Sequence, residues 1–195
     1  MTWLALALDL SFLLVGFGIR TAVQLRATAD SGWRIGRPHS VAELGARSGF
    51  VAALVLLVAS LVAGFAGATA DLPTWVNVLG VAVCLGATGL VFLAQLQMGA
   101  SWRIGVDPEE RTALVTGGVY RQVRNPIYTG MVAFVLGQVL VVPSVWSVAA
   151  VVVLVVGVEL QVRVVEEPYL ARVHGAAFSG WCATSGRFLP IVGRA

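Results

Sequence analysis

Three long stretches of this chain contain no charged residue. They cover residues 48–70, 72–102 and 125–158. An apolar run of roughly 18 residues or more is long enough to cross the hydrocarbon core of a bilayer as an α-helix. A water-soluble domain needs far more charge on its surface than the 12% of charged residues in this chain. The charge-free runs therefore predict an all-α, polytopic membrane protein.

The third run is too long to be one transmembrane helix. A straight helix over 125–158 would extend roughly 51 Å, whereas the hydrocarbon core is about 30 Å thick. Pro143 offers a break, because proline cannot continue a helix without losing a hydrogen bond. We therefore expect a helical hairpin with helices over about 126–142 and 145–165. With three earlier helices, the chain has about five transmembrane helices. The earlier helices are expected over about 3–19, 49–69 and 74–98.

The arginines indicate the orientation in the membrane. With about five helices, all the basic residues fall on or near one side, and the connections on the other side contain only Asp71. Cytoplasmic loops collect basic residues, so we expect the N-terminus outside and the C-terminus in the cytoplasm, in the inner (plasma) membrane. The first run contains Asp9 and no preceding arginine, which indicates a retained helix and not a signal peptide. We expect no nucleic-acid partner, because no basic patch follows a phosphate backbone.

Two smaller sequence features concern metal binding and substrate entry. Cys84 and Cys182 have neither metal-ligand nor redox spacing, so no metal site is expected. The tetrapeptide WRIG occurs at 33–36 and again at 102–105. Its tryptophan and arginine are typical of interfacial anchors, although they could also flank an opening for substrate at the level of the lipid headgroups.

Two polar clusters flank the predicted hairpin on its cytoplasmic side. They consist of Tyr120, Arg121, Arg124, Asn125 and Tyr128, and of Glu159, Arg163, Glu166 and Glu167. Because the hairpin returns the chain, the two clusters should lie at the same depth, where ionisable groups are candidates for function. Single members also have simpler explanations. Glu159 and Arg163 have the spacing of a helical ion pair, and Arg124 could reach the interface as an anchor.

The predicted layer offers cations for a carboxylate, carboxylates for an ammonium or sulfonium, and aromatic faces for a base. S-adenosylmethionine carries all of these partners. Soluble methyltransferases hold this cofactor on a glycine-rich turn between a strand and a helix. Gly16 and Gly18 do not form such a turn, because they lie in an apolar helix and no third glycine follows at position 21. The cofactor would therefore bind in a different way.

From about residue 99 to residue 190 the chain resembles the isoprenylcysteine carboxyl methyltransferase family of integral-membrane methyltransferases. The matching segments are GASWRIGVD (99–107), LVTGGVY (114–120), RNPIYTG (124–130), Arg163 with EEPYL (166–170), Gly175 and RFLP (187–190). The resemblance implies S-adenosylmethionine as the methyl donor and a cofactor pocket on the cytoplasmic side. It also implies a methyltransferase core over 99–195 that follows three N-terminal transmembrane helices over 1–98.

The resemblance further implies roles for individual residues. The cofactor would be lined by Tyr120, Arg124, Asn125, Pro126 and Tyr128, with Val115, Gly117 and Gly118 against its adenosine end. Glu167, with Glu166, would meet its amino group. Arg163 would orient an acidic acceptor near the reacting centre, so that Arg163 and Glu167 are the expected catalytic residues. Asn125 departs from the family, which usually has histidine there, and asparagine does not titrate near neutral pH.

The expected function is an S-adenosylmethionine-dependent methyltransferase that acts at the cytoplasmic membrane boundary. Its partners would be membrane lipid and a lipophilic or small acceptor, with a carboxylate or thiol favoured, and no obligate protein partner is evident. Two alternatives stay open. One is an NADPH-dependent membrane reductase of the sterol-reductase type, which also uses an R-x-P-x-Y-x-G stretch. The other is a non-catalytic membrane protein that retains the fold. The EE-x-x-L segment and the short length favour the methyltransferase.

Overall fold

The computed structural model describes residues 1–194 apart from 35, 37, 39 and 106–112. The described chain is helical. Its elements are α1 (Thr2–Leu13), the π-helical η1 (Leu14–Ile19), α2 (Arg20–Thr28), α3 (Val41–Phe65), α4 (Thr74–Met98), the short 3₁₀ helices η2 (Gly99–Ser101) and η3 (Gly118–Arg121), α5 (Pro126–Val141), α6 (Val145–Leu160), the π-helical η4 (Gln161–Glu166), α7 (Glu167–His174) and α8 (Ala176–Thr184).

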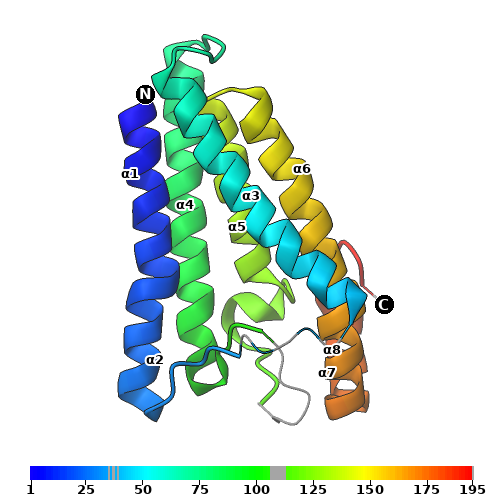
Figure 1. Ribbon diagram of the computed structural model, residues 1–195. Helices are drawn as coiled ribbons and strands as arrows, with labels where there is room; N and C mark the ends of the chain where they lie inside the picture. The colour runs from blue at the N-terminus through cyan, green and yellow to red at the C-terminus, as the bar shows by residue number, and fades with distance from the viewer. Residues whose placement is uncertain (35, 37, 39, 106–112, 195) are drawn as a thin grey trace.

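Four helical stretches are long and apolar enough to cross a membrane. They are Thr2–Thr28, Val41–Phe65, Thr74–Ser101 and Val145–His174, and the shorter apolar helix Pro126–Val141 lies among them. In Figure 1 the N-terminus and the α3–α4 and α5–α6 connections lie at one end of the bundle, whereas α2, α7 and α8 lie at the other. The expected hairpin is confirmed, because α5 ends at Val141 and α6 begins at Val145.

The hairpin is splayed, since α5 packs mainly along α4 and α6 packs mainly along α3 (Figure 1). Glycines let these backbones approach closely. A Cβ atom on Gly80 would lie 2.8 Å from the carbonyl oxygen of Gly137, and one on Gly49 would lie 3.0 Å from the Cα atom of Gly157. Lipid tails are as apolar as the helices, so close van der Waals packing of small residues holds membrane helices together. The glycines therefore determine which helices pair.

A matched pair of substitutions on α4 tests this packing. Gly80→Ala should lower the free energy of unfolding by about 1–3 kcal/mol, because the new methyl group overpacks the α4–α5 contact. Gly86 lies on the same helix and a Cβ there meets nothing within 4 Å. Gly86→Ala should therefore be neutral or stabilise by up to about 1 kcal/mol. Thermal unfolding in detergent measures both, and equal effects would contradict the packing account.

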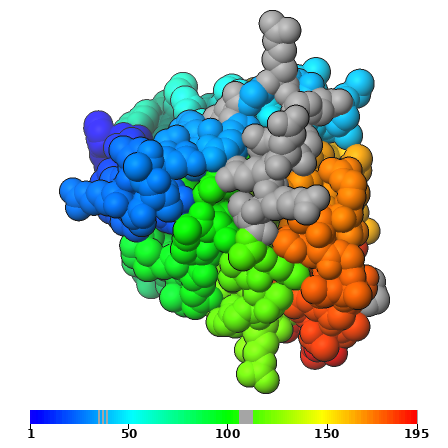
Figure 2. All heavy atoms as spheres, turned by 90° about the horizontal axis from the view of Figure 1, so that it is seen from below, coloured from blue at the N-terminus to red at the C-terminus, as the bar shows by residue number. Residues whose placement is uncertain are grey.

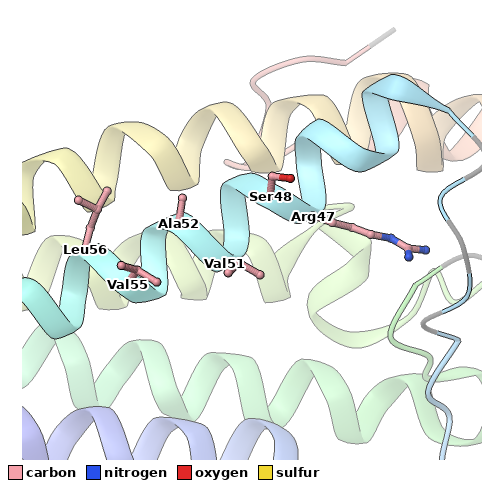
Figure 3. A pocket seen from close by; sticks show the side chains of 6 residues that line it. All are labelled: Arg47, Ser48, Val51, Ala52, Val55 and Leu56. Carbon is pink, nitrogen blue, oxygen red and sulfur yellow. The ribbon is translucent and has the colours of Figure 1, made fainter.

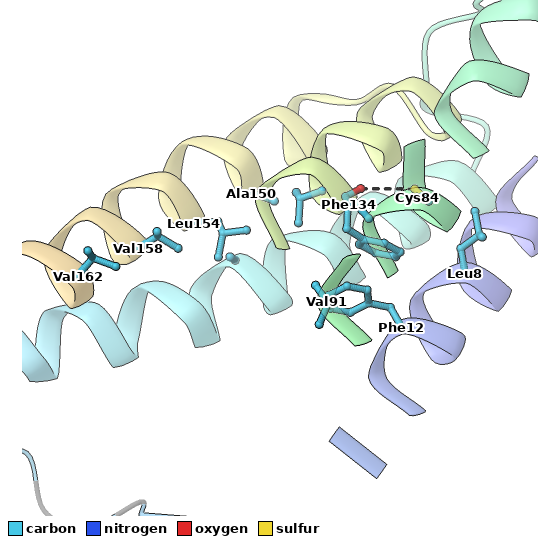
Figure 4. Packing of buried hydrophobic residues seen from close by; sticks show 12 residues of the cluster. Leu8, Phe12, Cys84, Val91, Phe134, Ala150, Leu154, Val158 and Val162 are labelled. Atoms are coloured by element: carbon cyan, nitrogen blue, oxygen red, sulfur yellow. Dashed lines mark hydrogen bonds between the residues drawn. The ribbon is translucent and has the colours of Figure 1, made fainter. Parts of the chain in front are cut away.

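The apolar core lies between α1, α3, α4, α5 and α6 (Figure 4). The rings of Phe12 and Phe134 have centroids 4.2 Å apart. Polar contacts also cross this region, where Gln138 Nε2 donates to Asp9 Oδ1 at 2.6 Å and to the carbonyl of Ala5 at 3.2 Å. The buried amide of Gln138 needs hydrogen-bonding partners, and it finds them on α1. These bonds therefore tie α5 to α1.

The first helix is longer than the sequence predicted, and the expected end at residue 19 is wrong. It continues to Thr28 because Arg20 is buried, with 1% exposure, and does not mark the membrane surface. The Arg20 guanidinium donates to the carbonyls of Gly99 at 2.6 Å and Gln95 at 3.3 Å, and it lies 4.6 Å from the ring centroid of Trp102. It thus caps the C-terminal end of α4, where a cation interacts favourably with the helix dipole.

The second helix also differs, since it begins at Val41 and not at residue 49, and it ends at Phe65. The side chain of Ser40 accepts a hydrogen bond from the backbone N–H of Glu43 at 3.1 Å. The sequence S-V-A-E at 40–43 carries the signature of this cap, a serine followed three residues later by glutamate. That signal predicts the observed start better than the end of the charged stretch does.

The last long helix does not end at residue 165 as expected. It continues through η4 and α7 to His174, although Pro168 lies within it. A proline ring collides with the preceding turn of a regular α-helix. The wider π turn of η4 directly precedes this position and accommodates the ring. The glutamates at 166 and 167 therefore lie inside a helical stretch and not in an irregular tail.

The two WRIG segments meet at the α2 end of the bundle. Trp33 and Ile104 form an isolated parallel bridge, in which the N–H of Arg34 donates to the carbonyl of Ile104 at 2.8 Å. Ile104 in turn donates to the carbonyl of Gly32 at 2.8 Å. Ile35 of the first copy and residues 106–107 of the GASWRIGVD segment lie outside the described residues. The bridge ties the α2–α3 connection to the segment that follows α4.

Candidate active site

The segment before α5 and the C-terminal tail run side by side. Val123 and Gly186 form a parallel bridge, and the N–H of Arg124 donates to the carbonyl of Gly186 at 2.8 Å. One residue later, the N–H of Asn125 donates to the carbonyl of Arg187 at 3.1 Å. Figure 2, viewed from below, shows the light green segment beside the orange and red C-terminal part of the chain. The tail is therefore one wall of the predicted layer.

Arg124 holds this wall in place. It is 5% exposed, and its guanidinium donates to the carbonyls of Ser185, Cys182 at 3.2 Å and Gly193 at 2.8 Å. It also contacts Glu167 Oε1 at 3.4 Å. Its Nε atom is buried without a hydrogen-bonding partner among the described residues. The sequence predicted Arg124 as a cofactor ligand, and the structure places most of its donors on the tail.

Glu167 is occupied by a second arginine that the sequence analysis did not assign. Arg187 Nε donates to Glu167 Oε1 at 2.8 Å, and Arg187 Nη2 donates to Glu167 Oε2 at 2.9 Å. This bidentate geometry is the strongest form of the arginine–carboxylate contact, and it raises the pKa of Arg187 above its usual value. Arg187 belongs to the RFLP segment, but no local pattern in the sequence links it to a carboxylate 20 residues earlier.

Glu166 has different partners. Its Oε1 atom accepts hydrogen bonds from the Tyr128 hydroxyl at 2.5 Å and from Gln161 Nε2 at 3.0 Å. Both donors are neutral, and Oε2 accepts no bond from the part of the chain that the structure describes. The ring of Tyr128 stacks on Phe50 of α3, with centroids 5.9 Å apart. The structure therefore brings Tyr128 and Glu166 together as the sequence predicted, with Gln161 as an additional member.

Buried aromatic side chains pack around Tyr120 of η3. Tyr120 is 5% exposed, and its hydroxyl donates to the carbonyl of Ala94 at 3.3 Å. Trp181 of α8 donates from Nε1 to the carbonyl of Tyr120 at 2.9 Å and lies edge-on to Phe178. Val115 packs against the same cluster. Burial raises the pKa of Tyr120 well above its usual value, so this hydroxyl is a neutral donor.

The glycine pair that precedes Tyr120 allows a close approach to α4. Gly118 has φ of +59°, and a Cβ atom there would collide with the side chain of Gln97. Gln97 Oε1 accepts a hydrogen bond from the N–H of Val119 at 2.8 Å. Gly117 lies just before η3, and a Cβ atom there meets nothing within 4 Å. The segment predicted to lie against adenosine is thus held on the end of α4.

Asn125 and Pro126 begin α5. Pro126 is buried at the first turn of the helix, where its missing N–H costs nothing. The Nδ2 atom of Asn125 donates to the carbonyl of Arg187 at 3.1 Å. Thr129 links the same elements, since its hydroxyl donates to the carbonyls of Asn125 at 3.0 Å and Phe188 at 2.7 Å. The amide of Asn125 therefore holds the tail at the position where the resembling family usually has histidine.

Arg163 does not join these residues in the structure. It pairs with Glu159, four residues earlier on the same helix, and the two side chains are 55% and 38% exposed. This contact is the helical ion pair that the spacing of Glu159 and Arg163 in the sequence also predicted as the simpler explanation. Among the described residues, Arg163 contacts neither Glu166 nor Glu167. Its predicted role at the acceptor stays a prediction.

An apolar groove of about 620 Å³ runs along α3 next to this site (Figure 3). It is lined by Arg47, Ser48, Val51, Ala52, Val55 and Leu56. Arg47 lies at one end, where it pairs with Glu43 at 2.5 Å, and the rest of the lining beyond Ser48 is apolar. Phe50, which stacks on Tyr128, precedes Val51 in the chain. The groove and the contact with Tyr128 therefore involve the same stretch of α3.

Residues 75–177, more than half of the chain, match the sequence profile of the phospholipid methyltransferase family. The chain belongs to this family. A search among curated proteins finds no match. The matched region of this phospholipid methyltransferase family member contains α4, α5, α6 and both polar clusters.

A solved structure resembles the whole bundle. It is described as the eukaryotic intramembrane Ras methyltransferase ICMT (isoprenylcysteine carboxyl methyltransferase) without a monobody. The TM-score is 0.63 with 19% sequence identity, over 97% of this chain and 68% of that one. The likeness confirms the fold that the sequence predicted. Family and fold together identify a multi-pass integral-membrane methyltransferase, and they give the reductase no support.

Proposed function

We propose that this methyltransferase transfers the methyl group of S-adenosylmethionine to a lipophilic or small acceptor at the cytoplasmic membrane boundary. The observation that carries the proposal is the charge pattern around residues 166 and 167. Glu166 has no cationic partner among the described residues, whereas Glu167 lies with two guanidinium groups. One excess negative and one excess positive centre lie side by side. This pattern complements the ammonium and the carboxylate of an α-amino acid, which S-adenosylmethionine carries.

The other described residues also fit this cofactor. Arg124 offers a buried Nε donor without a partner. The buried rings of Tyr120 and Trp181 support Val115, against which the adenosine end would lie. Bound S-adenosylmethionine would supply an electrophilic methyl group on a sulfonium. The residues of the protein would then hold the two reactants in line and exclude water, which is the main requirement of such a displacement.

The acceptor would reach the site from the membrane. The apolar groove follows α3, the helix whose Phe50 stacks on Tyr128, so we propose it as the path for a lipophilic chain (Figure 3). Arg163 is half exposed and would orient an acidic acceptor in place of Glu159. A carboxylate or thiolate acceptor needs little help from a general base. We therefore favour such an acceptor, since Asn125 cannot titrate near neutral pH.

Two measurements on the purified protein test the proposal. Isothermal titration should show binding of S-adenosylhomocysteine and none of NADPH. Incubation with radiolabelled S-adenosylmethionine and a total membrane lipid and metabolite extract should place label in an acceptor fraction. Binding of NADPH alone would favour a reductase. Absence of both S-adenosylhomocysteine binding and label transfer would contradict the proposed function.

A further inference from the structure

The two adjacent glutamates of the site have different partners. Both oxygens of Glu167 accept hydrogen bonds from Arg187, and Oε1 also contacts Arg124. From the described part of the chain, Glu166 accepts hydrogen bonds from the hydroxyl of Tyr128 and the amide of Gln161, both on one oxygen. The family resemblance gives both glutamates the same task, the binding of an ammonium group. In this protein the contacts of the two glutamates differ, so we expect the two residues to differ in function.

We propose that Arg187 is a positioning residue that reserves Glu167 for the C-terminal tail and leaves Glu166 as the receptor for the cofactor's ammonium group. The inference rests on the proposed function. It adds to that function a residue of the tail, and it assigns one glutamate to the cofactor and the other to the protein itself.

Charge explains why Glu167 is a poor ammonium receptor. Its side chain and that of Arg187 are each only 18% exposed. An ammonium that displaced Arg187 would break two charge-assisted hydrogen bonds and leave a partly buried guanidinium without its counterion. The guanidinium of Arg124, which has 2% side-chain exposure, would repel the ammonium from the other side. Binding at Glu167 therefore opposes two cations at once.

Glu166 has the complementary properties. The two donors on its Oε1 atom orient the carboxyl group without neutralising it. Its Oε2 atom accepts no hydrogen bond from the described residues. A partly buried carboxylate without a cationic partner gains more from an added cation than one that is already paired. Glu166 is therefore the glutamate that an ammonium group stabilises most.

The backbone keeps the two glutamates apart. Glu166 is the last residue of the π-helical η4, and Glu167 is the first residue of α7. Consecutive residues of a helix are rotated by roughly 100° about its axis, so their side chains point toward different surroundings. Arg187 is fixed independently, because its carbonyl accepts from the backbone and the side chain of Asn125, and its N–H donates to Val192 at 2.8 Å. The tail thus presents the guanidinium to Glu167 before any ligand binds.

A ligand pair separates the roles of the two glutamates. The affinities for S-adenosylhomocysteine and for its deaminated analogue are measured by isothermal titration, and their ratio reports the contact with the ammonium. The wild type should prefer S-adenosylhomocysteine about ten- to hundredfold. Glu166→Gln should abolish this preference. Glu167→Gln should lower both affinities together and keep the ratio. 5′-Methylthioadenosine, which lacks the amino-acid group, checks that each variant still folds.

The role of Arg187 is tested by a substitution that removes its guanidinium group from Glu167. In Arg187→Gln the freed carboxylate can attract the ammonium, so the ratio should be higher than in the double variant Arg187→Gln/Glu167→Gln. Arg187→Lys should retain part of the wild-type behaviour. Equal ratios in the single and double variants would overturn the proposal, as would loss of the ratio in Glu167→Gln with retention in Glu166→Gln. A wild type that binds both ligands equally would refute this inference alone, whereas one that binds neither would refute the proposed function as well.

Discussion

Replacement of Arg124 by alanine should undock the C-terminal tail and abolish methyl transfer. The side chain is 5% exposed and donates to three tail carbonyls and to Glu167. Alanine removes this donor from the carbonyls of the buried residues Cys182 and Ser185 and removes one cation from Glu167. Loss of one partner from a buried ion pair typically costs about 3–5 kcal/mol. Thermal unfolding in detergent and limited proteolysis of residues 185–194 should both show the loss.

Arg121 provides the matched control for this prediction. It lies three residues earlier and is exposed. Arg121→Ala should leave the unfolding temperature and the proteolysis of the tail unchanged. Arg124→Lys should restore part of the stability, because a lysine keeps the charge but not the fork of donors. A stable Arg124→Ala protein with a protected tail would show that the tail does not depend on this residue.

Replacement of Arg163 by alanine should lower activity and leave the stability of the fold nearly unchanged. The pair with Glu159 is an exposed i,i+4 contact, which contributes about 0–1 kcal/mol, so the fold should be retained. If Arg163 orients the acceptor, kcat/KM for the acceptor should fall about a hundredfold, since misplacement of a reactant by roughly 1 Å has such effects. The affinity for S-adenosylhomocysteine should stay unchanged. Steady-state kinetics with the acceptor and titration of the cofactor analogue measure the two quantities.

Glu159→Gln is the control that separates the ion pair from the acceptor role. It frees Arg163 without removing it, so activity should be retained or should rise. Turnover at the wild-type rate in Arg163→Ala would remove this arginine from the site. Equal losses in Arg163→Ala and Glu159→Gln would instead assign importance to the ion pair itself.

The transmembrane spans and the hairpin could be predicted from the sequence because they depend on local composition. Charge-free runs of bilayer length and Pro143 locate them without any tertiary contact. The helix ends were less predictable. Arg20 looks like a residue at the membrane surface, but it is buried where it caps α4. The start of α3 was readable from the Ser40–Glu43 cap, a local signal that the charge pattern obscured.

The candidate site, too, could be predicted only in part from the sequence. The sequence by itself determined which ionisable residues share one depth, because membrane-spanning lengths and the hairpin set that depth. Only the tertiary structure decided which of them touch. The contact of Arg187 with Glu167 joins residues 20 positions apart in separate elements, and the contact of Tyr128 with Glu166 spans 38 positions. Such pairings depend on how the tail and the π turn pack, and a one-dimensional pattern of charge does not contain that information.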